Sequence, residues 1–92
     1  MEIRKVETDK KRYLDLLLLA DEQEDMVDRY LERGTMYVLE DGGVKAECVV
    51  TDEGDGILEL KNIAVAPDFQ GRGYGKAMVA FLVQTYTEQH TV

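Results

Sequence analysis

Apolar residues along this chain follow two different periods, and each change of period marks a new element. Where apolar and polar residues alternate one by one, the pattern predicts a β-strand with one buried face. Four stretches show this alternation: residues 3–6, 35–40, 44–51 and 57–66. The run Asp41-Gly42-Gly43 predicts a hairpin turn after the second stretch, and residues 52–56 predict a turn after the third. These strands are therefore expected to form an antiparallel sheet.

Two helices are expected between the first and second strands. The first covers residues 10–20, begins after Thr8 or Asp9 as its N-cap, and carries four consecutive leucines that predict more burial than an ordinary surface helix has. The second begins with Asp21 as its N-cap and ends at Gly34, a residue type that commonly stops a helix. Its acidic residues either form a solvated face or help attract a cationic amine: Glu22, Asp25, Asp28 and Glu32.

The third strand predicts one apolar and one more polar face. Its two alternating sets are Ala46, Cys48 and Val50 against Lys45, Glu47 and Val49. Cys48 is expected to be a small core residue, because no neighbouring base or cation in the sequence would activate it as a nucleophile.

The last helix is predicted from Gly75 to about Glu88. It is apolar on most sides at its start, so it is expected to lie against the sheet. Together the elements predict one domain over residues 1–92, of the α+β (mixed α/β) class. Its order is β-α-α-β-β-β-α, with an antiparallel sheet and helices on its faces.

A glycine-rich turn joins the fourth strand to the last helix. Pro67 stops strand pairing because it has no N–H group. The glycines that follow stand at alternate positions: Gly71, Gly73 and Gly75. They let the backbone bend tightly and approach a ligand. The first helical turn offers N–H groups without helical partners and the positive end of the helix dipole, and Arg72 and Lys76 add two cations. The turn is therefore expected to bind an anion, most commonly a phosphate.

The spacing within the turn excludes two familiar phosphate-binding loops. A Walker A loop has Ser or Thr after its Gly-Lys pair, but Ala77 follows Lys76, and Gln70 occupies the position of the leading glycine. A dinucleotide-binding fingerprint has a glycine at the position where Lys76 stands.

The pattern that matches is Gln-x-x-Gly-x-Gly. It is present as Gln70-Gly71-Arg72-Gly73-Tyr74-Gly75, after a strand that ends Asn62-Ile63-Ala64-Val65-Ala66-Pro67. This strand, turn and helix resemble the central motif of the GNAT family of N-acetyltransferases, whose turn cradles the pyrophosphate of coenzyme A. The resemblance implies a GNAT-like N-terminal half and acetyl-CoA (or coenzyme A) as co-substrate.

The resemblance also implies which residues bind the cofactor. In the turn they are Gln70, Gly71, Arg72, Gly73, Tyr74, Gly75 and Lys76. On the preceding strand, the backbone at Ile63, Ala64 and Val65 would pair with the pantetheine arm and polarise the thioester carbonyl.

Glu59 is the candidate catalytic residue. Counting back from Gln70, it falls where histone-acetyltransferase-like members place their catalytic glutamate, which implies that it takes the proton of the attacking amine. Strand parity predicts that Glu59 shares a face with Lys61, Ile63 and Val65. The alternative is that Glu59 is a solvent-facing residue paired with Lys61.

Composition narrows the class of partner. The chain has 92 residues and a net charge of −8, which argues against nucleic-acid binding. The charge is uneven, because residues 1–60 hold 8 basic and 17 acidic side chains while the motif region is nearly neutral.

A single cysteine, no apolar run near ~20 residues and no signal-peptide pattern predict a cytoplasmic protein without a disulfide or a membrane span. The only histidine, His90, lacks the partners that a metal ligand needs, so no metal is expected.

Family members usually continue beyond the motif helix with another strand, a helix and a closing hairpin. The chain is therefore expected to be a truncated, N-terminal portion, with the tyrosine that protonates the departing thiolate in the missing part. The motif strand would then be an exposed edge. A homodimer is expected to cover it.

The leading functional hypothesis is transfer of an acetyl group from acetyl-CoA to a primary amine of a small molecule or peptide. Two alternatives remain open at this point: a non-catalytic module that binds coenzyme A or phosphate, and an inactive truncated fragment.

Overall fold

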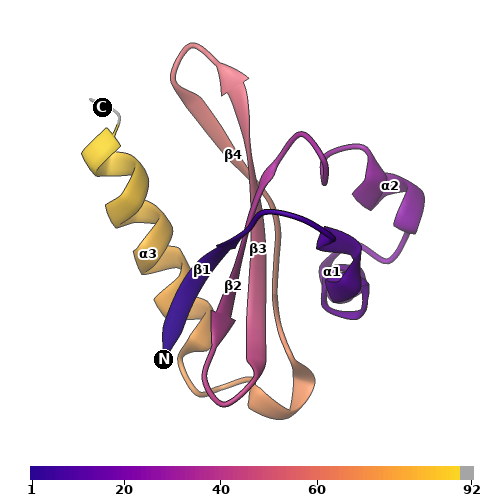
Figure 1. Ribbon diagram of the computed structural model, residues 1–92. Helices are drawn as coiled ribbons and strands as arrows, with labels where there is room; N and C mark the ends of the chain where they lie inside the picture. Colours follow the sequence, from indigo (N-terminus) through magenta and orange to yellow (C-terminus); the bar gives the residue numbers. More distant parts are fainter. Residues whose placement is uncertain (90–92) are drawn as a thin grey trace.

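A computed structural model describes residues 1–89 and shows one antiparallel sheet with helices on both faces (Figure 1). The strands are β1 (Glu2–Val6), β2 (Thr35–Glu40), β3 (Val44–Gly54) and β4 (Ile57–Val65). Their spatial order, β1-β2-β3-β4, is their order along the chain, and each neighbouring pair is antiparallel. This confirms the predicted antiparallel sheet and places β4 at one of its edges.

The helices lie on opposite sides of the sheet (Figure 1). One side holds α3 (Tyr74–Gln89), and the other holds α1 (Leu14–Ala20) and α2 (Glu24–Asp28). Two short 3-10 helices, η1 (Lys10–Tyr13) and η2 (Pro67–Phe69), precede α1 and α3. The predicted order of strands and helices is therefore confirmed. Within residues 1–89, every helix falls short of the length and apolar character that crossing a membrane requires.

Each face of the sheet has its own apolar core. On the α1 side the buried residues are Val6, Leu17, Val27, Tyr30, Leu31, Met36, Val38 and Val49. On the α3 side they are Leu39, Ala46, Cys48, Val50, Met78 and Leu82, which confirms Cys48 as a core residue. Because β3 contributes to both cores, both of its faces are buried. Glu47 therefore has no exposed surface, and the predicted polar face of β3 was wrong because α1 and α2 cover it.

The segment between β1 and β2 differs most from its prediction. Asp9 has a left-handed φ of 54° and makes no capping bond with its side chain, so the chain enters the helical region through η1. The second helix is five residues long and has Gln23 at its N-cap, whereas Asp21 follows the end of α1. Among the four leucines only Leu17 is fully buried, and Leu19 is 48% exposed. The predicted first helix is therefore present as η1 and α1, with Asp9 at its N-cap position but without a capping bond, whereas the predicted N-cap at Asp21 and the predicted burial of the leucine run were wrong.

Gly34 is required for a different reason from the one predicted. Its φ is not positive, so it does not provide a left-handed helix stop. A Cβ atom added at Gly34 would lie 2.7 Å from Val49 Cγ1 and 2.8 Å from the carbonyl oxygen of Tyr30. Glycine is therefore needed here because the start of β2 passes close to β3 and to the turn after α2.

The strands β3 and β4 meet in a tight turn. β3 continues to Gly54, beyond its predicted end at residue 51, and Gly54 pairs with Ile57. The two residues between them, Asp55 and Gly56, have φ values of 54° and 76°. Positive φ at both central residues is typical of the two-residue turns that match the twist of a hairpin.

β4 contains a β-bulge. Val49 of β3 stands opposite Asn62, but the next residue, Val50, stands opposite Leu60. Lys61 is therefore an extra residue on β4 between two paired ones. Such an insertion reverses the alternation of side chains on either side of it.

The bulge overturns the predicted orientation of Glu59. Glu59 pairs with Thr51 and so faces the α1 side of the sheet, whereas Ile63 and Val65 pack toward α3. The prediction that Glu59 shares a face with Ile63 and Val65 was wrong, because simple parity does not hold across Lys61.

Candidate functional site: the turn before α3

The turn between β4 and α3 is open where a ligand would approach. Gly71 and Gly73 have φ values of 80° and 87°, a left-handed conformation that only glycine adopts readily. A Cβ atom added at either position would meet no other atom within 4 Å. The two glycines are therefore required by the path of the backbone, and the space in front of them is unfilled.

The main-chain N–H groups of this turn are available to a ligand. Within residues 1–89, no hydrogen bond from the N–H groups of residues 71–76 to another protein group is present, whereas Ala77 donates to the carbonyl oxygen of Gly73 at 2.9 Å. These donors lie at the N-terminus of a helix of 16 residues, where the dipole also favours an anion. These donors and the helix dipole therefore suit an anion such as a phosphate, and the cofactor expected at this turn stays a prediction.

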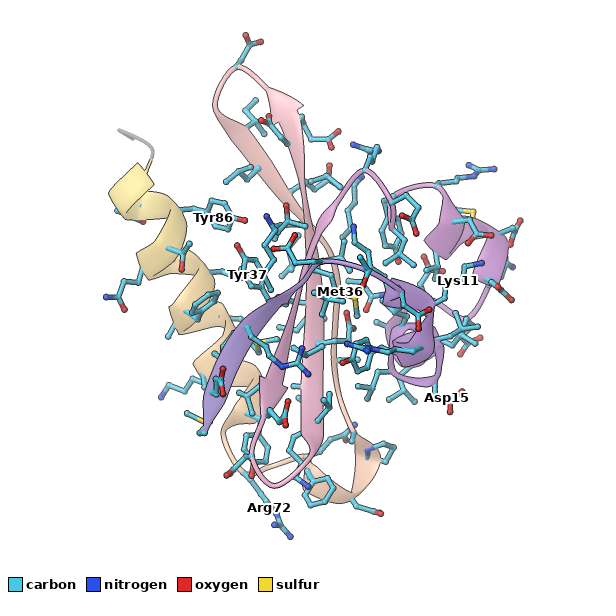
Figure 2. The ribbon with its side chains drawn as sticks, in the orientation of Figure 1. Lys11, Asp15, Met36, Tyr37, Arg72 and Tyr86 are labelled. Atoms are coloured by element: carbon cyan, nitrogen blue, oxygen red, sulfur yellow. The ribbon has the colours of Figure 1, made fainter. Side chains whose placement is uncertain are left out.

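Three cationic side chains surround the same turn. Arg72 and Lys76 are exposed, and Figure 2 shows Arg72 at the end of the molecule where the turn lies. The guanidinium of Arg72 lies 5.2 Å from the centre of the Phe69 ring, and the ammonium of Lys45 lies 3.9 Å from the same centre. Lys45 was missed by sequence reasoning, because it comes from the start of β3 and no motif links it to the turn.

Contacts with the protein itself fix both ends of the turn. The amide of Gln70 donates to the carbonyl oxygen of Val65 at 3.2 Å, which ties the turn to the end of β4. The hydroxyl of Tyr74 donates to the Asp41 carboxylate at 2.8 Å. This bond raises the pKa of Tyr74 above its ordinary value. Gly75 is helical, and a Cβ atom there would make an ordinary 3.5 Å contact with Val65.

The strand residues expected to contact pantetheine lie at the sheet edge. Ile63 and Val65 are partly buried against the core on the α3 side, and Ala64 is buried on the α1 side. Because β4 ends the sheet, its outer edge has no partner strand among the described residues. The outer edge of β4 is therefore open to pairing with an extended ligand, except that the Val65 carbonyl oxygen already accepts a bond from the Gln70 amide.

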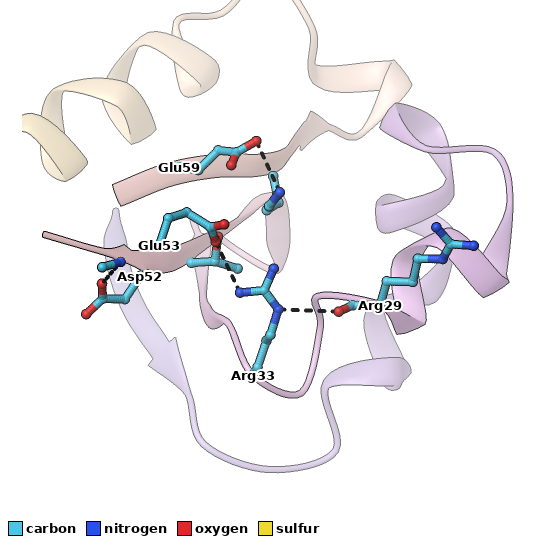
Figure 3. A network of polar contacts seen from close by, with 8 residues as sticks. Arg29, Arg33, Asp52, Glu53 and Glu59 are labelled. Atoms are coloured by element: carbon cyan, nitrogen blue, oxygen red, sulfur yellow. Dashed lines mark hydrogen bonds and ion pairs between the residues drawn. The ribbon is translucent and has the colours of Figure 1, made fainter. Parts of the chain in front are cut away.

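Glu59 lies within a network of charged side chains (Figure 3). Its carboxylate is 52% exposed and lies 3.1 Å from the ammonium of Lys61. Nearby, Glu53 accepts hydrogen bonds from Thr51 and from Arg33, which together with the charge of Lys61 lower the pKa of Glu53. The predicted pairing of Glu59 with Lys61 is therefore confirmed, and about half of the Glu59 side chain remains exposed.

An apolar groove lies between the first half of β4 and the second half of α3. Its volume is about 240 Å³, and its lining residues are Val50, Leu58, Glu59, Leu60, Val79, Leu82, Val83 and Tyr86. Leu60, Val79 and Val83 are all more than 40% exposed. This side of the molecule therefore has an exposed apolar surface next to the outer edge of β4.

Among residues 1–89, neither Cys48 nor a metal-binding cluster provides a second chemical site. Burial and the nearby charge of Glu47 raise the pKa of the Cys48 thiol to about 12, so Cys48 is not a nucleophile at neutral pH. Among residues 1–89, no group of three His, Cys, Asp or Glu side chains is placed to hold a metal ion. His90 lies outside the described residues.

Comparison with known proteins points to one family. A model of the acetyltransferase (GNAT) domain matches residues 32–92. The chain is 43% identical over 74 residues to a Bacillus subtilis (strain 168) protein named uncharacterized N-acetyltransferase YvbK. That match covers 79% of this chain and 47% of the relative, so the chain spans about half the relative's length.

Solved structures show the same fold. An acetyltransferase from Bacillus subtilis in complex with CoA is 34% identical with a TM-score of 0.86, over 95% of this chain and 58% of that one. A GNAT family acetyltransferase from Elizabethkingia anophelis with acetyl-CoA bound is 28% identical with a TM-score of 0.88, over 95% and 57%. An IAA acetyltransferase from Bacillus cereus is 33% identical with a TM-score of 0.83, over 96% and 60%.

Proposed function

Because this chain belongs to the GNAT acetyltransferase family, we propose that it binds acetyl-CoA at the turn before α3 and transfers the acetyl group to a primary amine. The observation that carries the proposal is the row of N–H groups at residues 71–76 that point to no protein acceptor. Two of the similar solved structures hold acetyl-CoA or CoA, which supports the choice of cofactor.

In this proposal the turn holds the pyrophosphate of the cofactor. The N–H groups of residues 71–76 donate to its oxygens, and Arg72, Lys76 and Lys45 supply positive charge around it. Such local cations matter because the chain as a whole carries a net charge of −8. The bound cofactor supplies the activated acetyl thioester, and the open edge of β4 orients its pantetheine arm.

Glu59 is proposed as the group that takes the proton of the acceptor. A primary amine must lose a proton before it can attack a thioester, so a base near the acceptor is required. The half-exposed carboxylate of Glu59 meets this need if the incoming ammonium replaces Lys61 as its partner. The ion pair with Lys61 orients the Glu59 carboxylate before the substrate arrives.

A cationic acceptor is proposed from the charge of the α2 side. Part of the acidic surface there is neutralised, because Lys11 pairs with Glu24 at 2.7 Å and with Asp28 at 2.6 Å. Asp25 and Glu32 are exposed and take part in no ion pair among the described residues. These carboxylates would attract an amine that carries more than one positive charge.

A second candidate is a module that binds coenzyme A without turnover. This chain spans about three fifths of the length of the solved relatives. The two candidates share the turn and differ only in whether the acetyl group leaves.

One experiment separates them. Thermal unfolding is followed with coenzyme A alone, and free thiol is measured after acetyl-CoA is mixed with a panel of amines. Stabilisation with thiol release supports the transferase, and stabilisation without release supports the module. No stabilisation at millimolar coenzyme A would contradict both.

Gly73→Asp tests the site within this experiment. The substitution adds bulk and negative charge where the phosphates would lie, so it is expected to abolish the stabilisation by coenzyme A. Gly56→Asp is the matched control, since Gly56 also has a positive φ and open space around it but lies in the turn at the opposite end of β4 (Figure 1).

A further inference from the structure

The side chain of Lys61 places a primary amine where the proposed function requires one. Its nitrogen lies 3.1 Å from the carboxylate of Glu59, the group proposed to take the acceptor's proton. Among the described residues, no other lysine nitrogen is paired with Glu59. An amine beside a base has two of the three things that acetyl transfer needs, and only the acetyl donor has to be added.

The bulge in β4 leaves Lys61 outside both apolar cores. Val49 stands opposite Asn62 and Val50 opposite Leu60, so Lys61 is the extra residue between two paired ones. A bulge commonly redirects a side chain in this way. The Lys61 side chain is 24% exposed and has a flexible four-carbon stem. Its amine is therefore held beside Glu59 by an ion pair rather than by packing.

The strand that carries Lys61 is also the strand proposed to hold the cofactor. The pyrophosphate is proposed at the turn that follows β4, and the pantetheine arm along residues 63–65. The arm would therefore lead away from the turn and back along β4, with its thioester end toward Lys61. Lys61 precedes Ile63 by two residues, a spacing of roughly 7 Å along a strand, which a lysine side chain can span.

Carboxylates surround the Lys61 amine on this side of β4. Hydrogen bonds from Thr51 and Arg33 lower the pKa of Glu53, and the charge of Lys61 lowers it further, so Lys61 lies near Glu53 as well as Glu59. The same negative charges would attract the ammonium of an external acceptor. Lys61 therefore already has the surroundings proposed for a bound acceptor.

We propose that Lys61 is a site of self-acetylation, at which the chain transfers the acetyl group of bound acetyl-CoA to its own lysine. The inference rests on the proposed binding of acetyl-CoA at the turn before α3. Glu59 takes a proton from the Lys61 ammonium, and the nitrogen forms a bond to the acetyl carbon. The bond from that carbon to sulfur breaks. The products are an acetylated lysine, the thiol of coenzyme A and one proton released to solvent.

The modification would change the proposed acceptor site. Acetylation removes the charge of a lysine and with it the ability to form an ion pair. Acetylated Lys61 would therefore leave Glu59, whose carboxylate is then open to an external amine. The unmodified chain keeps Glu59 paired, whereas the acetylated chain presents it to the acceptor.

The test incubates the chain with acetyl-CoA in the absence of any added amine. We expect the chain to gain the mass of one acetyl group, an equal amount of thiol to be released, and peptide mapping to place the acetyl group at Lys61. Direct reaction of lysines with the thioester in solution would give another pattern, because Lys5 and Lys76 are exposed and would be modified first.

Two variants and one control identify the groups involved. Lys61→Arg keeps a positive charge beside Glu59 but offers no lysine amine, so it is expected to gain no acetyl group. Glu59→Gln removes the base and is expected to slow acetylation of Lys61 by about 100-fold or more. Lys5→Arg changes an exposed lysine of β1 and is expected to be acetylated at Lys61 like the unaltered chain.

Two further measurements test whether bound cofactor and a single chain are involved. A small acetyl thioester without a nucleotide, S-acetyl-N-acetylcysteamine, is expected to modify the exposed lysines before Lys61. Transfer within one chain predicts a rate constant that does not change when the protein is diluted at saturating acetyl-CoA. A rate constant that falls on dilution would contradict it.

Binding of coenzyme A, measured by thermal shift, separates this inference from the function on which it rests. If coenzyme A stabilises the chain but Lys61 stays unmodified, or is modified no faster than Lys5, self-acetylation is wrong and the proposed binding stands. Equal rates for Glu59→Gln and the unaltered chain would also contradict the proposal. If coenzyme A does not stabilise the chain, the proposed function and self-acetylation both fail.

Discussion

The hydroxyl of Tyr74 donates a 2.8 Å hydrogen bond to the carboxylate of Asp41, which joins the first residue of α3 to the turn between β2 and β3. Lys45, just after that turn, lies over Phe69, just before the glycines. The turn proposed to bind phosphate is therefore held by a hairpin that lies about 30 residues earlier in the chain. Its geometry depends on residues outside the motif by which it was identified.

Tyr74→Phe tests this dependence. Loss of the bond to Asp41 is expected to loosen the start of α3 and weaken binding of coenzyme A about threefold to tenfold. Isothermal titration calorimetry measures the change. Tyr13→Phe is the control, because the Tyr13 hydroxyl accepts a bond from Arg4 on the opposite side of the molecule. An equal effect of the two substitutions would argue against a specific role for Tyr74.

Gly34→Ala tests the close approach of β2 to β3. The added methyl group would lie within 3 Å of Val49 and of the Tyr30 carbonyl oxygen, so the free energy of unfolding is expected to fall by about 1–3 kcal/mol. Gly75→Ala is the contrast, because it adds a methyl group at an ordinary distance inside a helix, where alanine is favoured. Urea denaturation measures the free energy of unfolding of both variants. Equal decreases for Gly34→Ala and Gly75→Ala would contradict the close approach at Gly34.

The buried carboxyl of Glu47 predicts how stability depends on pH. Its pKa is about 8 in the folded chain against an ordinary value of 4.5, so between these values the folded state holds a proton that the unfolded state has lost. The protonated carboxyl makes its full contribution to the free energy of unfolding below pH 4.5. This contribution decreases as pH rises, by up to about 1.4 kcal/mol per pH unit, until about pH 8.

Glu47→Gln removes this dependence. Its free energy of unfolding, measured in urea between pH 5 and pH 9, is expected to fall less steeply with pH than that of the unaltered chain. Parallel curves would mean that Glu47 does not titrate in the folded state with a raised pKa.

Association of two copies stays a prediction from the sequence. The open edge of β4 and the apolar groove beside it give a physical reason for it, since an exposed strand edge next to Leu60, Val79 and Val83 favours pairing. Light scattering at micromolar concentration is expected to give the mass of a dimer. A single monomer peak would contradict the prediction.

The sheet and α3 could be predicted because their signals are local. Alternating residues identified all four strands, and Asp41-Gly42-Gly43 identified the hairpin. The region between β1 and β2 could not be predicted as well, because polar residues that resemble N-caps occur there without forming cap bonds. Packing against the sheet, rather than local capping, decides where α1 and α2 begin and end.

The turn was found from the spacing of its glycines, but the rest of the site was not. The bulge at Lys61 leaves no mark in the sequence, so the orientation of Glu59 was predicted wrongly. Glu47 looked like an exposed polar residue because only the folded chain shows that both faces of β3 are covered. Lys45 and Asp41 reach the turn through the hairpin, a contact that no local pattern reveals.

The central claim is that the main-chain amides of residues 71–76 bind the phosphates of coenzyme A. Titration of ¹⁵N-labelled protein with coenzyme A, followed through the backbone amide resonances, tests it most directly. We expect the resonances of residues 71–76 to shift most and to saturate, and Gly73→Asp to abolish these shifts. Resonances in this turn that stay unmoved at saturating coenzyme A, or larger shifts elsewhere in the chain, would contradict the account.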